Sequence, residues 1–316
     1  MTFNYLFFSF TLHLMTYSSA DEWCYDIQAQ SEPLCNVPSK WNNISASCTQ
    51  RKQSPIDIIT CHATFDPNLK PFKFDGYDKE RELKLENNGH SVELTLADQE
   101  AIQITGGGLP GTYVATQLHF HWGNESKSGS EHYLNGEQYA MELHIVHKRK
   151  AGSDTRGRST ATSELAVLGF FYDVGLPNNG YNNLTKALER ITLPAQSTVL
   201  RVRLQDLIPK EEQLKLFYRY EGSLTTPHCN ETVIWTVFPA IIQLNKSQIN
   251  AFSKNLRYSK DQEMIANFRP IQSRNGRTIF TSGVDAVLPN ARYLLITLFV
   301  FYVTSIRGSA FTFNSC

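Results

Sequence analysis

Residues 117–123 read QLHFHWG and residues 141–146 read MELHIV, and these two stretches decide the fold. Both are rich in β-branched, aromatic and aliphatic residues with polar ones interleaved, which indicates two β-strands. Side chains alternate between the faces of a strand, so His119 and His121 point the same way. If the two strands pair, His144 joins them, and three imidazoles converge on one point of a stiff sheet.

Three neutral imidazoles around an open fourth position are a ligand set of catalytic zinc. Gln117 and Glu142 each precede a histidine by two positions, share its face and can accept a hydrogen bond from its second ring N–H. The alternative is a set of hydrogen-bonded core histidines, because the chain has nine histidines in all. Three histidines on two apolar strands, each set with a polar partner, favour zinc, although the helical His-Glu-x-x-His pattern is absent.

The rest of the chain reads as a sheet-dominated, mainly β (α+β) single domain with a few peripheral helices. Short runs predict strands at residues 83–85, 92–96, 101–104, 165–171, 199–204 and 214–220. Helical periodicity is brief, near residues 183–190 and 247–256. The glycines at 106–108 follow no strand-to-helix phosphate loop and are interpreted as a turn.

Composition argues against a nucleic-acid partner and for a single domain. The chain has 30 basic and 30 acidic residues and a formal net charge of zero, so nothing predicts a nucleic-acid partner. Without its ends, the chain keeps roughly 260 residues, which is enough for one large core. No linker or internal repeat divides them.

The first twenty residues are apolar and end in small residues at Ser18 and Ala20. This order predicts a secretory signal peptide over residues 1–20, with Asp21 as the new N-terminus. The missing Lys or Arg near the start is a departure from that pattern. The alternative is a buried terminal helix.

The C-terminal end resembles a signal for a glycosylphosphatidylinositol (GPI) anchor. Small residues at 282–284, a spacer and the apolar run 293–303 have the required order, which predicts attachment at Ser282 and removal of residues 283–316. The apolar run is too short to span about 30 Å of hydrocarbon as a helix. Arg307 and a polar end depart from the pattern, so a plainly secreted or differently tethered chain stays open.

Cysteines and glycosylation sequons agree with a secretory route. Of the six cysteines, Cys316 would leave with the tail, and the others can pair in an oxidising compartment. Five Asn-x-Ser/Thr sequons predict glycosylation sites, at Asn43, Asn124, Asn183, Asn230 and Asn245.

Several motifs together resemble the alpha-class carbonic anhydrases. They comprise the two opening stretches, GSEH at 129–132, ELHIVH at 142–147, SLTTP at 223–227, QSPIDI at 53–58, NNGH at 87–90 and NFRP at 267–270. The likeness runs in the family's order from roughly Trp23 to Phe280. Within the family, the chain resembles the membrane-anchored branch, the type-four isozymes.

This resemblance implies a zinc lyase that hydrates CO2 reversibly to bicarbonate and a proton. It implies one large, mostly antiparallel twisted sheet as the catalytic domain, residues 21–282, with Zn2+ held by His119, His121 and His144. Zinc lowers the pKa of a bound water to about 7, and the resulting hydroxide attacks CO2. In the family, a threonine that matches Thr225 accepts the hydrogen bond of that hydroxide. It donates to a glutamate that matches Glu131, whose ionised carboxylate can only accept.

Further roles rest on the same resemblance. Thr226 would contact the reacting oxygens more weakly, and the carbonyl of Asn267 would accept a hydrogen bond from His121. The substrate pocket would be lined by Val146, Val167, Leu224 and Trp235. Each of these four would otherwise be read as ordinary core.

The resemblance also assigns a path for the proton. His90 matches the family's proton shuttle, and an unperturbed pKa of about 6.5 suits that task. Tyr25 and Asn88 would order the intervening waters. The alternative for His90 is a turn histidine without a role. The remaining histidines are read as structural or surface residues (His62, His132, His147, His228) or as part of the signal segment (His13).

The membrane-anchored branch further implies the disulfides Cys24–Cys35 and Cys48–Cys229. Cys61 is then left over, as a buried inert thiol or, alternatively, as half of an intermolecular disulfide. The expected location is the extracellular face of the plasma membrane, with a secreted form as the alternative. A neighbouring bicarbonate transporter stays open as a partner.

Two rival functions remain at this stage. One is a catalytically silent, carbonic-anhydrase-like binding domain without metal, which the survival of all three histidines, Thr225 and Glu131 disfavours. The other is a zinc esterase, for which the sequence offers neither a serine nucleophile nor an acyl pocket.

Overall fold

The structure is a computed structural model that describes residues 22–31, 34–96, 101–126, 128–153 and 163–283. The predicted signal peptide, residues 1–20, and the tail from residue 284 lie outside the described residues. None of the helices in the described part of the chain is long and apolar enough to cross a membrane.

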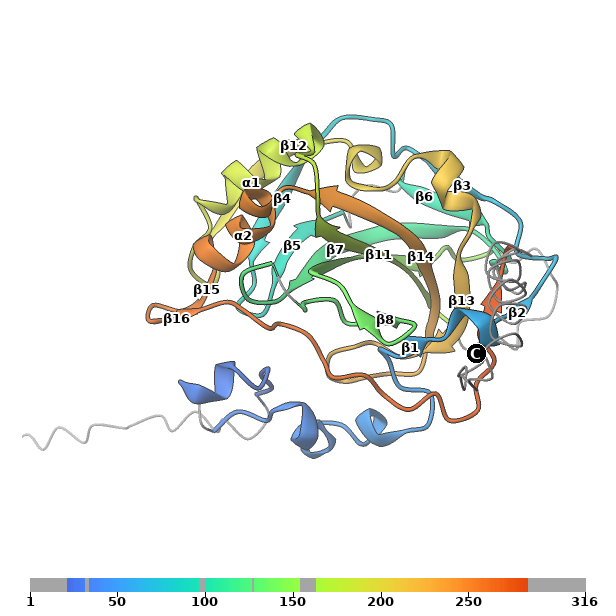
Figure 1. The fold of residues 1–316 in the computed structure, drawn as a ribbon, viewed down its shortest axis with the longest axis horizontal. Helices are drawn as coiled ribbons and strands as arrows, with labels where there is room; N and C mark the ends of the chain where they lie inside the picture. The colour runs from blue at the N-terminus through green and yellow to red at the C-terminus, as the bar shows by residue number, and fades with distance from the viewer. Residues whose placement is uncertain (1–21, 32–33, 97–100, 127, 154–162, 284–316) are drawn as a thin grey trace, which may run out of the picture.

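A twisted twelve-stranded sheet crosses the molecule (Figure 1). Its main path runs β12 (Ser197–Val202), β4 (Arg81–Asn87), β5 (Val92–Thr95), β7 (Tyr113–Trp122), β10 (Met141–Arg149), β11 (Leu165–Val174), β14 (Val233–Leu244), β13 (Tyr218–Gly222), β17 (Phe280–Thr281) and β2 (Thr64–Phe65), with β3 (Phe72–Asp75) and β6 (Gln103–Gly106) joined beside β7. Only β11–β14 and β17–β2 pair in parallel among these strands. The predicted fold class, a mainly β domain around a large and mostly antiparallel sheet, is confirmed.

Helices and small sheets surround this sheet. The two α-helices of the described residues, α1 (Asn182–Leu188) and α2 (Lys246–Asn255), lie together at one end (Figure 1). The 3-10 helices are η2 (Gln28–Gln30), η3 (Pro38–Asn43), η4 (Ala46–Thr49), η5 (Thr60–His62), η6 (Asn179–Tyr181), η7 (Leu204–Leu207) and η8 (Glu211–Lys215). Small sheets are formed by β1 (Asp57–Ile58), β8 (Tyr133–Leu134) and β9 (Glu137–Gln138), and by β15 (Arg257–Ser259) and β16 (Gln262–Glu263).

Capping explains where α2 begins. The Asn245 side chain accepts a hydrogen bond from the Gln248 backbone N–H at 2.9 Å, and the Gln248 side chain accepts one from the Asn245 backbone N–H at 3.2 Å. This reciprocal pair satisfies two N–H groups that have no partner inside the helix. The predicted helix 247–256 therefore starts one residue earlier.

The longest strand, β14, was not predicted from the sequence. It is a continuous apolar run that pairs with β11 on one side and β13 on the other, so it lacks the alternation of a half-buried strand. Pro239 lies where the pairing shifts, between Phe238 and Ile242, and a strand tolerates proline at such an irregularity. The strand predicted at 214–220 is also partly wrong, because its first residues form the end of η8.

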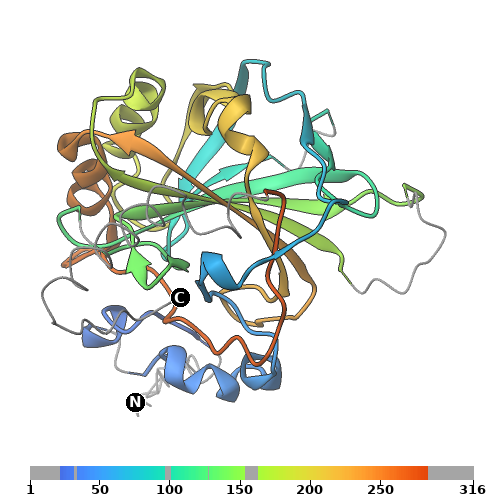
Figure 2. The same cartoon turned by 45° about the vertical axis from the view of Figure 1, so that its right-hand side comes forward.

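The N-terminal segment packs along the segment that precedes β17. Figures 1 and 2 show the blue residues 22–31 and 34–50 lying on the same side of the sheet as the orange residues 264–280. The Arg269 side chain connects the two segments by donating to the carbonyls of Ser54 and Cys48, at 2.8 and 3.1 Å. The early chain therefore reaches the sheet face that carries the histidines.

Both predicted disulfides, Cys24–Cys35 and Cys48–Cys229, are present. The interpretation of Cys61 as a buried inert thiol is wrong. Cys61 lies half-buried in η5, which has no buried residue, and no described cysteine is a free thiol.

One face of the central strands packs into the hydrophobic core, and the opposite face carries the histidines. Leu118 and Phe120 of β7 and Leu143 and Ile145 of β10 are buried in the main hydrophobic cluster. Their neighbours in sequence point to the opposite face, because side chains alternate along a strand. Packing on the core face therefore holds the strands in place, and the opposite face presents the three histidines to the candidate site.

Candidate metal centre

The pairing of β7 with β10 brings the three predicted ligands together. The strands are antiparallel, with His144 opposite His119 and Glu142 opposite His121. Residues opposite each other share a face, with Cβ atoms about 4.5–5.5 Å apart. One ring nitrogen from each of His119, His121 and His144 lies within 4.8 Å of the others, so the predicted triad forms.

Each triad histidine hydrogen-bonds to its predicted partner. His119 Nδ1 donates to Gln117 Oε1 at 2.8 Å, and His121 Nδ1 donates to the carbonyl of Asn267 at 2.7 Å. His144 uses its other nitrogen and donates from Nε2 to Glu142 Oε1 at 2.8 Å. These acceptors fix the tautomers, so Nε2 of the first two rings and Nδ1 of His144 carry lone pairs.

These lone pairs fit a metal ion. His121 Nε2 and His144 Nδ1 are 3.1 Å apart, and two nitrogens without hydrogens repel at that distance unless a cation lies between them. A tetrahedral ion with metal–nitrogen bonds of about 2.0–2.1 Å sets its nitrogens about 3.3 Å apart. Burial lowers the pKa of all three imidazoles, that of His121 to about 4, so the rings are neutral at pH 7, as metal ligation requires.

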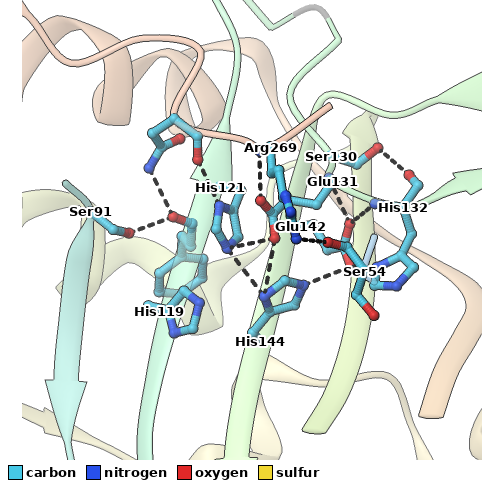
Figure 3. A network of polar contacts seen from close by, with 12 residues as sticks. Ser54, Ser91, His119, His121, Ser130, Glu131, His132, Glu142, His144 and Arg269 are labelled. Atoms are coloured by element: carbon cyan, nitrogen blue, oxygen red, sulfur yellow. Dashed lines mark hydrogen bonds and ion pairs between the residues drawn. The ribbon is translucent and has the colours of Figure 1, made fainter. Parts of the chain in front are cut away.

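Glu142 is a buried carboxylate with every lone pair used. Oε2 accepts from the backbone N–H groups of Glu131 and His132, each at 2.8 Å, while Oε1 accepts from His132 Nδ1 and His144 Nε2 (Figure 3). Burial alone would raise the pKa of Glu142. The electrostatic interactions and hydrogen bonds with His132 and His144 outweigh that effect and hold the pKa of Glu142 well below its usual range.

His132 has a larger role in the site than the sequence suggested. It is fully buried, and besides its bond to Glu142 its Nε2 lies 2.6 Å from the hydroxyl of Tyr220, which in turn hydrogen-bonds to Ser54. This series of hydrogen bonds, which runs through Glu142 and His132, connects the predicted ligand His144 to Tyr220 in strand β13. The only feature of the sequence that could have indicated this role is the position of His132 inside the GSEH motif.

Glu131 presents one oxygen atom to the triad. Oε1 accepts from the backbone N–H of Arg269 at 2.8 Å, whereas Oε2 lies 3.4 Å from His121 Nε2 and has no close hydrogen-bond partner among the described residues. Burial raises the pKa of Glu131 to about 7, and the nearby Thr225 hydroxyl lowers it in part. Glu131 Oε2 is thus a buried acceptor that lies beside the ring nitrogens and near the Thr225 hydroxyl.

The four residues predicted to line the substrate pocket lie together. Val146, Val167 and Trp235 are cross-strand neighbours on β10, β11 and β14, and they belong to one buried cluster against which Leu224 packs. The ring of Trp235 lies 4.8 Å from that of His144, centre to centre. An apolar wall therefore adjoins the triad.

Comparison with known proteins agrees with this geometry. The family model for eukaryotic-type carbonic anhydrases matches residues 36–283. The chain belongs to this family. It is 44% identical over 272 residues to carbonic anhydrase 4 of Rattus norvegicus, covering 84% of this chain and 86% of the relative. It is 45% identical over 283 residues to carbonic anhydrase 4 of Oryctolagus cuniculus, covering 87% and 90%. It is 37% identical over 254 residues to carbonic anhydrase 12 of Homo sapiens, covering 77% and 70%.

In this carbonic anhydrase, His90 lies against the N-terminal segment. Its ring stacks on Trp23 with centroids 3.8 Å apart and planes 15° from parallel, and its Nδ1 lies 3.3 Å from Gln28 Oε1. Burial lowers the pKa of His90 to about 4. The unperturbed value of about 6.5 therefore does not hold for this ring, which burial shields from water.

The two predicted water-ordering residues differ in how accessible they are. Tyr25 is buried, with its ring 6.5 Å from that of His90. Asn88 is exposed, but its Oδ1 accepts from the backbone N–H groups of His90 and Ser91 at 3.0 and 2.8 Å. That oxygen is committed to the turn that carries His90.

The remaining predicted sites lie on the surface of the carbonic anhydrase domain. Thr226 is half-buried, and its carbonyl accepts from the Cys229 backbone N–H at 2.8 Å. Ser282 is half-buried, and its hydroxyl donates to the carbonyl of Lys215 at 2.8 Å. Asn245 is half-buried, and four sequon asparagines are exposed, namely Asn43, Asn124, Asn183 and Asn230.

Proposed function

We propose that this carbonic anhydrase hydrates CO2 reversibly, forming bicarbonate and a proton, at a zinc ion held by His119, His121 and His144. The observation that carries the proposal is the pair of lone-pair nitrogens 3.1 Å apart on His121 and His144, completed by His119. Three neutral nitrogens with an open fourth position suit zinc in a catalytic role. When bound, zinc lowers the pKa of a coordinated water to about 7 and supplies a nucleophile at neutral pH.

Glu131 and Thr225 give that nucleophile its orientation. An ionised carboxylate can only accept hydrogen bonds, so the Thr225 hydroxyl that faces Glu131 must donate to it and has only lone pairs left for the reacting oxygen. A cation at the triad favours the ionised form of Glu131. Thr226, next in the same loop, would contact the oxygens more weakly.

The apolar wall would hold the substrate. CO2 carries no net charge and no hydrogen-bond donor, so Val146, Val167, Leu224 and Trp235 offer it a site from which water is excluded. The close approach of Trp235 to His144 supports placing this site beside the metal. The same chemistry on activated esters is a second, weaker activity for which the described residues offer no acyl pocket.

His90 would carry the product proton toward bulk solvent. In its stacked position the pKa is about 4, so protonating the ring at pH 7 costs about 4 kcal/mol. We expect this uphill step to limit maximal turnover in weakly buffered solution.

We also propose the processing and location of the chain. Residues 1–20 would be a signal peptide, residues 21–282 the catalytic domain, and residues 283–316 a propeptide replaced by a GPI anchor on Ser282 at the extracellular face of the plasma membrane. The two disulfides and the exposed sequons support a secretory route. Phosphatidylinositol-specific phospholipase C should release activity from intact cells, and activity that stays on the membrane would contradict the anchor.

The catalytic proposal is tested by measuring zinc content and CO2 hydration on the same purified protein, before and after chelation. Purified protein should contain one zinc per chain and hydrate CO2, chelation should remove both, and added zinc should restore both. A His144→Ala variant is the matched control, since it should lose zinc and CO2 hydration while the sheet stays folded. Full activity in metal-free protein would refute the zinc site, and ester turnover faster than CO2 hydration would favour the esterase.

A further inference from the structure

Gln28 of η2 clamps the turn that carries His90. Its side chain is buried, with 3% of its surface exposed, and makes three hydrogen bonds. Oε1 accepts from the Tyr25 backbone N–H at 3.2 Å and lies 3.3 Å from His90 Nδ1, while Nε2 donates to the carbonyl of Gly89 at 3.3 Å. One amide thus joins the N-terminal segment to both the ring and the backbone of the turn.

The partners of this amide fix its orientation. The carbonyl of Gly89 can only accept, so it must face the NH2 group, and the backbone N–H of Tyr25 can only donate, so it must face the oxygen. Gln28 Oε1 is therefore the atom opposite His90 Nδ1. An oxygen at that place requires a hydrogen on Nδ1, and the lone pair of the neutral ring is then on Nε2.

No other described residue hydrogen-bonds to the ring nitrogens of His90, so Nε2 stays available. Trp23 covers one face of the ring. Trp23 and Gln28 flank Cys24, whose backbone N–H donates to the Asn36 carbonyl and whose sulfur is bonded to Cys35. The N-terminal segment therefore holds the ring by its face and by one nitrogen.

We propose that Gln28 is a positioning residue for proton transfer, which holds His90 with its hydrogen on Nδ1 and makes Nε2 the nitrogen that takes up and releases the product proton. This inference rests on the proposed role of His90 as proton carrier. When a water molecule gives a proton to Nε2, its O–H bond breaks and leaves hydroxide, an N–H bond forms and the ring becomes a cation. That N–H bond breaks when the proton passes to solvent or buffer. The Gln28 oxygen binds the cation more strongly than the neutral ring and so opposes the effect of burial on His90.

The test compares Gln28→Met with Gln30→Met in the zinc-loaded enzyme. Methionine has a similar length but no amide, and Gln30 is an exposed residue of the same helix. In weak buffer, Gln28→Met should lower kcat for CO2 hydration about tenfold, a fraction of what a positioned proton carrier contributes, with kcat/KM unchanged. Added imidazole should restore kcat, and Gln30→Met should match the parent enzyme. A kcat of Gln28→Met equal to that of the parent would overturn the proposal.

The tautomer itself gives a readout independent of activity. Nitrogen-15 shifts of His90 in the zinc-loaded parent enzyme at neutral pH should show a protonated Nδ1 and a bare Nε2, and the opposite pattern would overturn the proposal even if Gln28→Met failed to fold. If His90→Ala leaves kcat unchanged, the proposed role of His90 as proton carrier fails, whereas the nitrogen shifts still decide which nitrogen of the neutral His90 ring carries the hydrogen.

Discussion

Glu131, Glu142 and Gln28 all act at the residue scale through groups that can hydrogen-bond in one direction only. Glu142 accepts four hydrogen bonds and fixes His144, whereas in the proposed mechanism Glu131 keeps one oxygen for the Thr225 hydroxyl. The amide of Gln28 is oriented by two backbone partners. Residues that do not react therefore decide which group donates and which accepts in each of these hydrogen bonds.

Val167 tests the substrate pocket at the same scale. Its side chain is 1% exposed and lies between Val146 and Trp235. Val167→Tyr should lower CO2 hydration at least a hundredfold, because the larger ring fills the space beside His144, while zinc content stays at one per chain. The matched change is Val199→Tyr on the exposed side of β12, where Val199 is 62% exposed; it should leave both unchanged. Full activity in Val167→Tyr would place the substrate elsewhere.

At the scale of elements, local pattern predicted some strands and missed others. Strands β7 and β10 were predicted because their polar side chains alternate with apolar ones, so the ligand pairs could be read directly. Strand β14 was missed because it is paired on both sides and holds Pro239. The pKa of His90 and the role of His132 could not be predicted, since they depend on contacts with Trp23 and Tyr220, which are distant in sequence.

His147 gives strand β10 a predicted pH dependence. This buried ring donates from Nδ1 to the Ala166 carbonyl at 3.3 Å and accepts from the Tyr77 hydroxyl at 2.7 Å. Burial lowers its pKa to about 4, so between pH 6.5 and 4 the unfolded chain binds a proton there that the folded chain does not. The ring's contribution to stability is thus present above pH 6.5 and falls by about 3 kcal/mol toward pH 4. His147→Gln does not titrate, so its unfolding free energy in urea should fall less steeply than that of the parent. Parallel curves would contradict the assignment.

In the molecule as a whole, each of the two disulfides supports a different step of the proposed mechanism. One lies beside the loop that acts in CO2 hydration, and the other lies in the segment that positions His90 for proton release. Cys48–Cys229 joins positions 181 apart in sequence and follows the Thr225 loop, whereas Cys24–Cys35 joins positions 11 apart and lies in the segment that clamps His90. Loop-closure entropy grows with the length of the closed loop, so the long connection is worth about 5 kcal/mol of unfolding free energy and the short one about 3.

Replacing each pair by serine should therefore separate two kinetic effects. Cys48→Ser with Cys229→Ser loosens the loop of Thr225, which acts in the hydration step, so kcat/KM should fall together with about 5 kcal/mol of stability. Cys24→Ser with Cys35→Ser loosens Trp23 and Gln28, which act on proton release, so kcat in weak buffer should fall while kcat/KM stays near that of the parent. Added imidazole should restore only the second variant. If both variants lost kcat/KM equally, the N-terminal segment would serve folding alone, because a clamp on His90 leaves the hydration step untouched.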